Sequence, residues 1–171
     1  MKRLRDWRYW TWLRDGAIFL VLLFGIRWYQ KRDMPQGAAP DLTGKDLHGA
    51  SVSLAGYRGQ PVLVHFWATW CGVCKAEQSN IDALSRDLPV LSVASKSGEV
   101  NEVATYVQEN AVAPSVVVDP DGELARRFGV HLFPSTFVID GTGAIRHVEV
   151  GYSTQVGLRA RMWLAKFSPL F

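Results

Sequence analysis

Cysteine is scarce in this sequence, with two residues in a chain of 171. Two cysteines form at most one disulfide, which excludes the disulfide-rich scaffolds of small secreted proteins. They also exclude a closed zinc site built from four cysteines. Apolar residues make up 48% of the chain and charged residues 20%, so the composition indicates a globular protein. The length fits one domain with an additional segment.

A basic surface is missing from most of the chain. The net charge is +3, but residues 1–39 hold eight Lys/Arg and three Asp, a charge of +5, which leaves −2 for residues 40–171. Because nucleic-acid binding needs Lys and Arg gathered on the folded domain, a nucleic-acid partner is not expected. No Gly-x-Gly-x-x-Gly motif follows a predicted strand, so no nicotinamide or flavin cofactor is expected either.

Long hydrophobic runs are also missing, since the longest, residues 16–26 (GAIFLVLLFGI), has eleven residues. As a helix it covers about 16 Å, against roughly 30 Å of bilayer hydrocarbon. Its flanks extend the apolar stretch, because six Trp and Tyr residues bracket it and the Arg14 and Arg27 side chains can reach the interface. We therefore expect an uncleaved, single-span anchor. A cleaved signal peptide and a buried soluble helix are the alternatives.

The distribution of Lys and Arg predicts the orientation of this anchor. Five precede the run and three follow it, which favours a cytoplasmic N-terminus. We predict a cytoplasmic basic segment over 1–15, a transmembrane anchor over 16–30, a linker over 31–39 and a folded domain over 40–171. The domain would then lie on the periplasmic or extracytoplasmic side of a bacterial inner membrane.

The apolar pattern of the domain alternates between strands and helices. The near-continuous apolar run at 61–68 predicts a strand buried on both faces. Helical spacing of apolar residues predicts helices over 74–88, 99–110, 123–128 and 154–167. Further strands are expected over 52–54, 89–95, 115–118, 136–139 and 144–150, the last two joined as a hairpin. The fold class is α/β, with a central mixed β-sheet flanked by helices.

The two cysteines stand three residues apart, between the buried strand at 61–68 and a predicted helix. A cysteine at a helix N-terminus meets unpaired N–H groups, so its thiolate is stabilised and its pKa falls below about 8.5. Cys71 is the expected nucleophile, and Cys74 would resolve the mixed disulfide. Half of a metal site, a pair of structural cysteines and a two-thiolate Cu(I) site are the alternatives.

Residues 66–77 (FWATWCGVCKAE) resemble the active-site segment of thioredoxin-like proteins. Thr69 and Glu77 match the membrane-anchored TlpA/ResA branch, which includes cytochrome c maturation reductases. The segment 133–140 (FPSTFVID) resembles the cis-proline segment of that family. Residues 148–152 (VEVGY) and 157–165 (GLRARMWLA) look most like the suppressor-of-copper-sensitivity D group. The resemblance covers residues 39–167 and implies a thioredoxin-like fold.

The resemblance implies further site residues. Pro134 would be cis and pack against the disulfide, which leaves the Phe133 main chain free to pair with an extended client chain. Trp70, Gly72 and Val73 are the other predicted substrate contacts. No metal is expected at the site.

Two titratable residues complete the predicted catalytic set. Glu77 would lie close to the cysteine pair, where it would raise the thiol pKa or accept the proton of Cys74; the alternative is a first-turn carboxylate favoured by the helix dipole. His65 stands where the family carries Asp or Asn. It would transfer a proton at neutral pH, or it is a hydrogen-bonded core histidine.

Val73 offers neither charge nor hydrogen bond to a thiolate, so the dipeptide between the cysteines argues against a strong oxidant. We expect a reduction potential of roughly −200 to −280 mV. The predicted activity is reduction of disulfides in extracytoplasmic client proteins, with a DsbD-type thiol-relay protein as the electron donor implied by the resemblance. An apocytochrome c thiol reductase and a Cu(I)-binding module are the alternatives.

Overall fold

A computed structural model describes residues 3–167, except for the side chains of residues 3–11, 27, 28 and 31. It consists of two compact units, residues 1–32 and 33–171. The first unit contains one helix, α1 (Arg3–Lys31), whose described apolar side chains, such as Leu13 and Phe24, are exposed. No helix in the described part of the chain is long and apolar enough to cross a membrane, so the predicted transmembrane helix over 16–30 is not confirmed.

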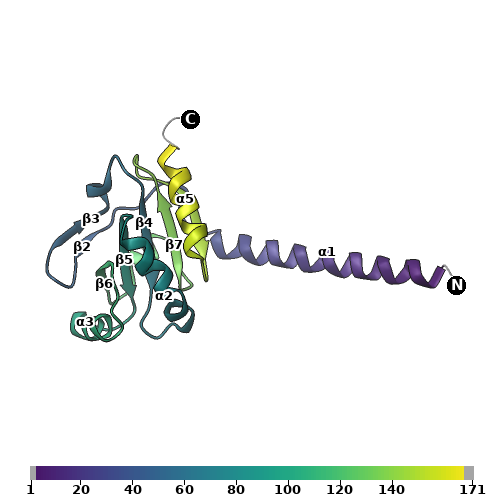
Figure 1. Cartoon of the computed structure of the whole chain (residues 1–171), viewed down its shortest axis with the longest axis horizontal. Helices are drawn as coiled ribbons and strands as arrows, with labels where there is room; N and C mark the ends of the chain where they lie inside the picture. Colours follow the sequence, from purple (N-terminus) through teal and green to yellow (C-terminus); the bar gives the residue numbers. More distant parts are fainter. Residues whose placement is uncertain (1–2, 168–171) are drawn as a thin grey trace. The chain divides into compact units, whose positions relative to one another are not determined.

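The second unit is built on a six-stranded sheet with the order β1-β8-β7-β4-β5-β6 (Figure 1). Strand β4 pairs in parallel with β5 and antiparallel with β7, so the sheet is mixed, as predicted. The strands of this sheet are β1 (Gly37–Ala38), β4 (Val62–Trp67), β5 (Val90–Ser95), β6 (Ser115–Asp119), β7 (Ser135–Ile139) and β8 (Ala144–Val150). A separate two-stranded sheet pairs β2 (Thr43–Lys45) with β3 (Ser51–Ser53).

Helices cover the sheet. Helices α2 and α5 pack against each other, α2 contacts β5 and α5 contacts β7, as Figure 1 shows on the near face of the sheet. The helices of this unit are α2 (Gly72–Ser85), α3 (Val100–Glu109), α4 (Glu123–Arg127) and α5 (Gln155–Phe167), with a short 3-10 helix, η1 (Leu54–Tyr57). The predicted α/β class with a mixed sheet flanked by helices is therefore confirmed.

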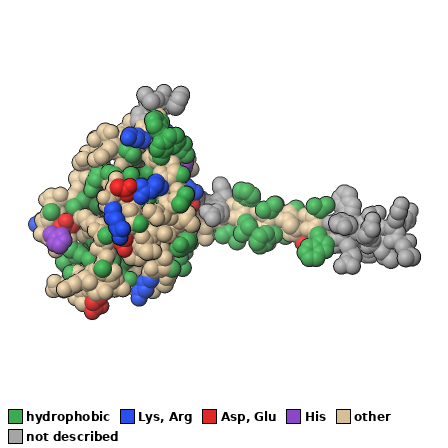
Figure 2. Space-filling model, viewed as in Figure 1, with side chains coloured by type: hydrophobic (Ala, Val, Ile, Leu, Met, Phe, Trp, Pro, Cys, Tyr) green, Lys and Arg blue, Asp and Glu red, His purple; other side chains and the backbone are tan. Residues whose placement is uncertain are grey.

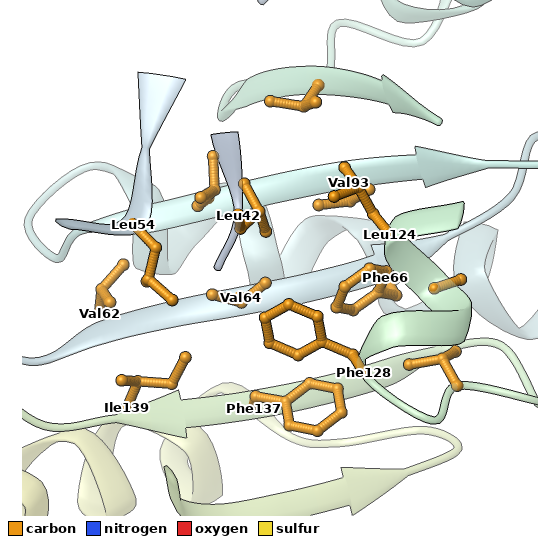
Figure 3. Close-up of a cluster of buried hydrophobic side chains, with 14 of the residues drawn as sticks. Leu42, Leu54, Val62, Val64, Phe66, Val93, Leu124, Phe128, Phe137 and Ile139 are labelled. Atoms are coloured by element: carbon orange, nitrogen blue, oxygen red, sulfur yellow. The ribbon is translucent and has the colours of Figure 1, made fainter. Parts of the chain in front are cut away.

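Alternate residues of β4 face opposite sides of the sheet, because side chains alternate along a strand. Val62, Val64 and Phe66 belong to an apolar cluster in which the rings of Phe66, Phe128 and Phe137 meet edge to face or tilted (Figure 3). Leu63, from the other side, packs with residues of α2 and α5. The side chains of β4 therefore pack into hydrophobic clusters on both faces of the sheet.

The domain begins earlier than the sequence suggested. Met34 is buried in the apolar cluster of Phe66, and Gly37–Ala38 pair with Ile145 and Ala144 of β8. These residues were assigned to a linker over 31–39, and the structure corrects that boundary to Asp33. A two-residue strand carries no periodic signal, which is why the pattern did not reveal it. Residues 1–2 of the predicted basic segment and 168–171 of the predicted domain lie outside the described residues.

Candidate active site

The cysteine pair lies at the junction between β4 and α2. Helix α2 begins at Gly72, two residues earlier than predicted, and Cys71 is its N-cap in an extended conformation. The Cys71 sulfur accepts a hydrogen bond from the Cys74 amide over 3.1 Å, and the two sulfurs are joined as a disulfide. An amide donor and the positive end of the helix dipole both stabilise negative charge on sulfur. When the disulfide opens, the Cys71 thiolate is therefore stabilised at this position.

Both cysteines are largely buried. Cys71 is 7% exposed and Cys74 is 2% exposed, and both pack in a cluster with Trp67 and with Val103 of α3. Cys71, the expected nucleophile, is thus slightly more exposed than Cys74. An incoming disulfide must therefore approach along the outer side of the helix N-terminus, where Gly72 is exposed.

An apolar surface lies beside the disulfide. The Trp70 side chain is 64% exposed, and its ring meets the ring of Phe133 edge-on at 5.8 Å between centroids. Val73 and Leu132 are also about half exposed. The Trp70 indole N–H donates to the Lys96 carbonyl over 2.8 Å, which fixes the ring in place. We call Trp70, Val73, Leu132 and Phe133 the apolar rim.

The predicted cis-proline is confirmed, since the Phe133–Pro134 peptide bond is cis. Pro134 is buried, and the Phe133 side chain packs against the cluster that holds both cysteines. The Pro134 carbonyl accepts a hydrogen bond from the Gly151 amide, just beyond β8. The segment predicted to meet the client thus lies at the disulfide, while the pairing of a client with the Phe133 main chain stays a prediction.

Glu77 is buried on the same face of α2 as Cys74, one turn further along. Its side chain has no exposed surface, and its Oε1 accepts a hydrogen bond from the Ser153 amide over 2.8 Å. Its Oε2 has no hydrogen-bond partner among the described residues. Burial raises the pKa of Glu77 to about 7, against the lowering effect of its contacts with Ser153. The carboxyl group can therefore take up or release a proton near neutral pH.

His65 is buried in the middle of β4. Its Nδ1 lies 2.9 Å from the Thr136 hydroxyl oxygen on β7, and its Nε2 has no partner in the described part of the chain. Burial lowers the pKa of His65 to about 3. The imidazole is therefore neutral at physiological pH and hydrogen-bonded, which is the core-histidine alternative. Its predicted role in proton transfer stays a prediction.

Three residues that sequence reasoning missed connect the site to the rest of the fold. Asn80 of α2 donates to the Ser153 carbonyl over 3.0 Å, and the Ser97 hydroxyl accepts from the Thr69 amide over 3.1 Å. Ser97 and Ser153 lie in loops after β5 and β8, and no local pattern in the sequence marks either as part of a site. Within residues 3–167, no group of three or more His, Cys, Asp or Glu side chains could hold a metal ion.

Comparison with known proteins agrees with this geometry. Residues 35–148 match the model of the AhpC/TSA family. The chain is 31% identical over 160 residues to a thioredoxin-like protein of Haemophilus influenzae, which covers 91% of this chain and 95% of that protein. It is also 27% identical over 129 residues to the thiol-disulfide oxidoreductase ResA of Geobacillus thermodenitrificans, which covers 72% of this chain and 74% of ResA.

A solved structure shows the same fold. A thiol:disulfide interchange protein of the thioredoxin family from Chlorobium tepidum superposes with a TM-score of 0.65 at 25% identity, which covers 78% of this chain and 98% of that one. The predicted thioredoxin-like fold is confirmed, and the suppressor-of-copper-sensitivity D subgroup stays a prediction. The chain belongs to the AhpC/TSA family and, within it, to the thioredoxin-like thiol-disulfide oxidoreductases.

Proposed function

We propose that this protein reduces disulfides in extracytoplasmic client proteins. The observation that carries the proposal is the position of Cys71 as N-cap of α2. Its sulfur accepts a hydrogen bond from the Cys74 amide and forms a disulfide with the Cys74 sulfur. This arrangement supplies an activated thiolate and a resolving thiol in one helical turn.

The exchange proceeds in two balanced steps. The Cys71 thiolate attacks one sulfur of the client disulfide, so that a mixed disulfide forms and the other client sulfur leaves as a thiolate. The Cys74 thiolate then attacks the Cys71 sulfur, which releases the second client thiolate and forms the Cys71–Cys74 disulfide. The client disulfide gains the two electrons that the enzyme cysteines lose, and the two released client thiolates take up protons from solvent, to which the protons of the enzyme thiols are lost.

Glu77 is the group placed to receive the proton of Cys74 before the second step. It lies one turn from Cys74 on the same buried face, and its pKa of about 7 lets it hold a proton near neutral pH. His65, with a pKa of about 3, is a much weaker base. We therefore expect His65→Gln to retain the pH dependence of client reduction, and Glu77→Gln to lose the inflection near pH 7.

The apolar rim is the proposed contact surface for the client. Trp70 and Val73 expose apolar area directly beside Cys71, and Phe133 supports the Trp70 ring. An unfolded or extended client segment would bury this area and bring its disulfide to Cys71. A folded client with its disulfide in the core could not reach it.

Electrons must reach the Cys71–Cys74 disulfide from another thiol protein, because the chain carries no nicotinamide-binding motif. A DsbD-type thiol relay is the proposed donor, and the extracytoplasmic side of a bacterial inner membrane is the proposed location. Cell fractionation of the tagged chain tests that location and shows in the same gel whether the protein sediments with membranes.

The direct test is capture of clients by Cys74→Ser in cells. Without the resolving thiol, the mixed disulfide between Cys71 and the client should persist and be isolated in non-reducing gels, whereas Cys71→Ser should capture nothing. Captured chains with a Cys-x-x-Cys-His motif would identify apocytochrome c as the client. If Cys74→Ser captured no protein and the reduced wild-type chain bound Cu(I) tightly through both cysteines, the reductase proposal would be wrong.

A further inference from the structure

Two side chains of helix α2 are hydrogen-bonded to the main chain of Ser153, in the loop between β8 and α5. Glu77 accepts a hydrogen bond from the Ser153 amide over 2.8 Å, and Asn80 donates to the Ser153 carbonyl over 3.0 Å. The Asn80 amide also lies 3.1 Å from the Tyr152 hydroxyl. Glu77 and Asn80 stand one turn apart, so two side chains of one helix hold both polar groups of one residue's main chain.

The Ser153 amide donates a hydrogen bond to the Glu77 carboxyl group, at its Oε1 atom. Its Oε2 has no hydrogen-bond partner among the described residues, and no ion pair in residues 3–167 involves Glu77. A buried carboxylate is stabilised by each donor that it meets and destabilised by loss of water. Burial raises the pKa of Glu77, and the contacts with Ser153 lower it.

Apart from burial, the contacts with Ser153 are what set the pKa of Glu77. The buried histidine of β4, His65, is neutral near pH 7. Charged side chains of the helices on this side are paired elsewhere, Asp82 with Gln78, Arg159 with Asp87 and Arg161 with Glu149. The buried side chains that the sheet and α5 contribute on this side include Ser92 of β5, Thr136 and Val138 of β7, and Leu158 and Met162 of α5.

We propose that Asn80 is a positioning residue for thiol exchange, because it holds the Ser153 amide in place to donate to the Glu77 carboxylate. Without Asn80 the loop after β8 loses its carbonyl anchor to α2, and the amide is free to move away from Oε1. The carboxylate form of Glu77 then loses a donor, so Glu77 stays protonated to higher pH. The link to catalysis rests on the proposed function, but the effect on Glu77 itself does not.

Asn80→Ala tests this in the oxidised full-length protein, with the Glu77 carboxyl carbon followed by ¹³C NMR and assigned with Glu77→Gln. Alanine suits a helix, so α2 should be retained. Because the carboxylate loses a hydrogen-bond donor, we expect the midpoint of Glu77 to rise by about 1–2 pH units. Asn80→Gln keeps an amide donor and should return the midpoint part of the way.

Gln78→Ala is the matched control. It removes an amide from the same helix, but that amide donates to Asp82 over 2.8 Å and not to the loop after β8. We expect the wild-type midpoint in this variant. Tyr152→Phe, which removes the second Asn80 partner and leaves Ser153 in place, should also keep the midpoint near that of the wild type.

The pH profile of disulfide reduction gives the second readout. Its inflection near pH 7 should move upward in Asn80→Ala together with the NMR midpoint, which a purely structural role would not produce. If Asn80→Ala and Gln78→Ala show the same Glu77 midpoint, the positioning role is wrong even when the enzyme is active. If the wild type reduces no disulfide while the midpoint still shifts, the proposed function fails and the positioning of Glu77 stands.

Discussion

The two faces of the central sheet differ in whether their buried polar atoms have hydrogen-bond partners. On one face Phe66, Phe128 and Phe137 form the centre of a hydrophobic cluster (Figure 3). On the other face the same strand β4 presents Leu63, His65 and Trp67 in turn. The polar side chains buried on the Phe66 face, Ser95, Asp119 and Ser135, are hydrogen-bonded. Beneath α2, His65 and Glu77 each keep one buried polar atom without a partner among the described residues. The comparison indicates that one face supplies stability and the other supplies the chemistry.

The two buried titratable residues on this face, Glu77 and His65, occupy corresponding positions along α2 and β4. Cys74 packs in one apolar cluster with Trp67, and Ile81 packs in another with Leu63. Glu77 lies between Cys74 and Ile81 along α2, as His65 lies between Trp67 and Leu63 along β4. Each of these two buried titratable residues therefore lies, along its own element, between a residue of the cluster that holds the disulfide and a residue of the cluster that holds Leu63.

Figure 2 shows a corresponding contrast on the outside of the folded unit, where apolar side chains are interspersed with charged ones. The charged residues of this unit include exposed ion pairs such as Arg159 with Asp87. Such pairs contribute little to stability because water screens them. The distinction between the two buried faces therefore carries more information about function than the charged surface does.

Phe66→Ala should give the largest change, and only in stability. Phe66 is fully buried against two other rings, and deletion of such a ring costs about 3–5 kcal/mol. Urea denaturation measures the loss. Disulfide reduction per folded molecule should keep its pH profile; a shifted inflection near pH 7 would show that the two faces do not act separately.

Glu77→Gln should change how stability depends on pH. In the folded protein the pKa of Glu77 is about 7, against 4.5 in the unfolded chain, so between these values only the folded state holds the proton. Stability is therefore fully present below pH 4.5 and falls as the pH rises to 7. The loss is about 3.5 kcal/mol at about 1.4 kcal/mol per pKa unit.

Denaturation midpoints of Glu77→Gln between pH 4.5 and 7 should be flatter than those of the wild type. Glu109→Gln, an exposed residue at the end of α3, is the matched control and should follow the wild-type curve. An unchanged slope in Glu77→Gln would mean that the carboxyl group is ionised throughout this range, and would remove it from the proposed proton route.

Trp70→Ala should have the smallest effect on stability, under about 1 kcal/mol, because the side chain is mostly exposed. Its effect should be on recognition. We expect a higher KM for a disulfide-bonded protein client and little change for a small-molecule disulfide. Trp163→Ala removes a similarly exposed ring from α5 and serves as the control. Equal KM changes in both variants would argue against the apolar rim as the contact surface.

Most of the domain could be predicted from its sequence because its elements carry strong periodic signals. The run that became β4 and the spacing of Ile81 and Leu84 on α2 located these elements to within a few residues. The start of α2 was placed two residues late, because Gly72 and Val73 lie on the exposed side of the first turn and add nothing to an apolar pattern. The two-residue strand β1 left no pattern at all.

Only the site residues that belong to a short sequence motif could be predicted. The cysteine spacing and the resemblance around Pro134 led to Cys71, Cys74 and the cis bond. The hydrogen bond from Ser153 to Glu77 joins residues 76 positions apart, and the one from Asn80 joins residues 73 apart. Only the packing of α2 and α5 on one face of the sheet brings these residues together, and a single sequence does not record that packing.

The most direct test of the central claim is the reduction potential of the Cys71–Cys74 pair in the full-length protein, equilibrated against glutathione buffers. A reductase should give a value below about −220 mV, within the roughly −200 to −280 mV expected from the Gly72-Val73 dipeptide. A value above about −180 mV would mean that the pair oxidises or isomerises its clients, and would contradict the account.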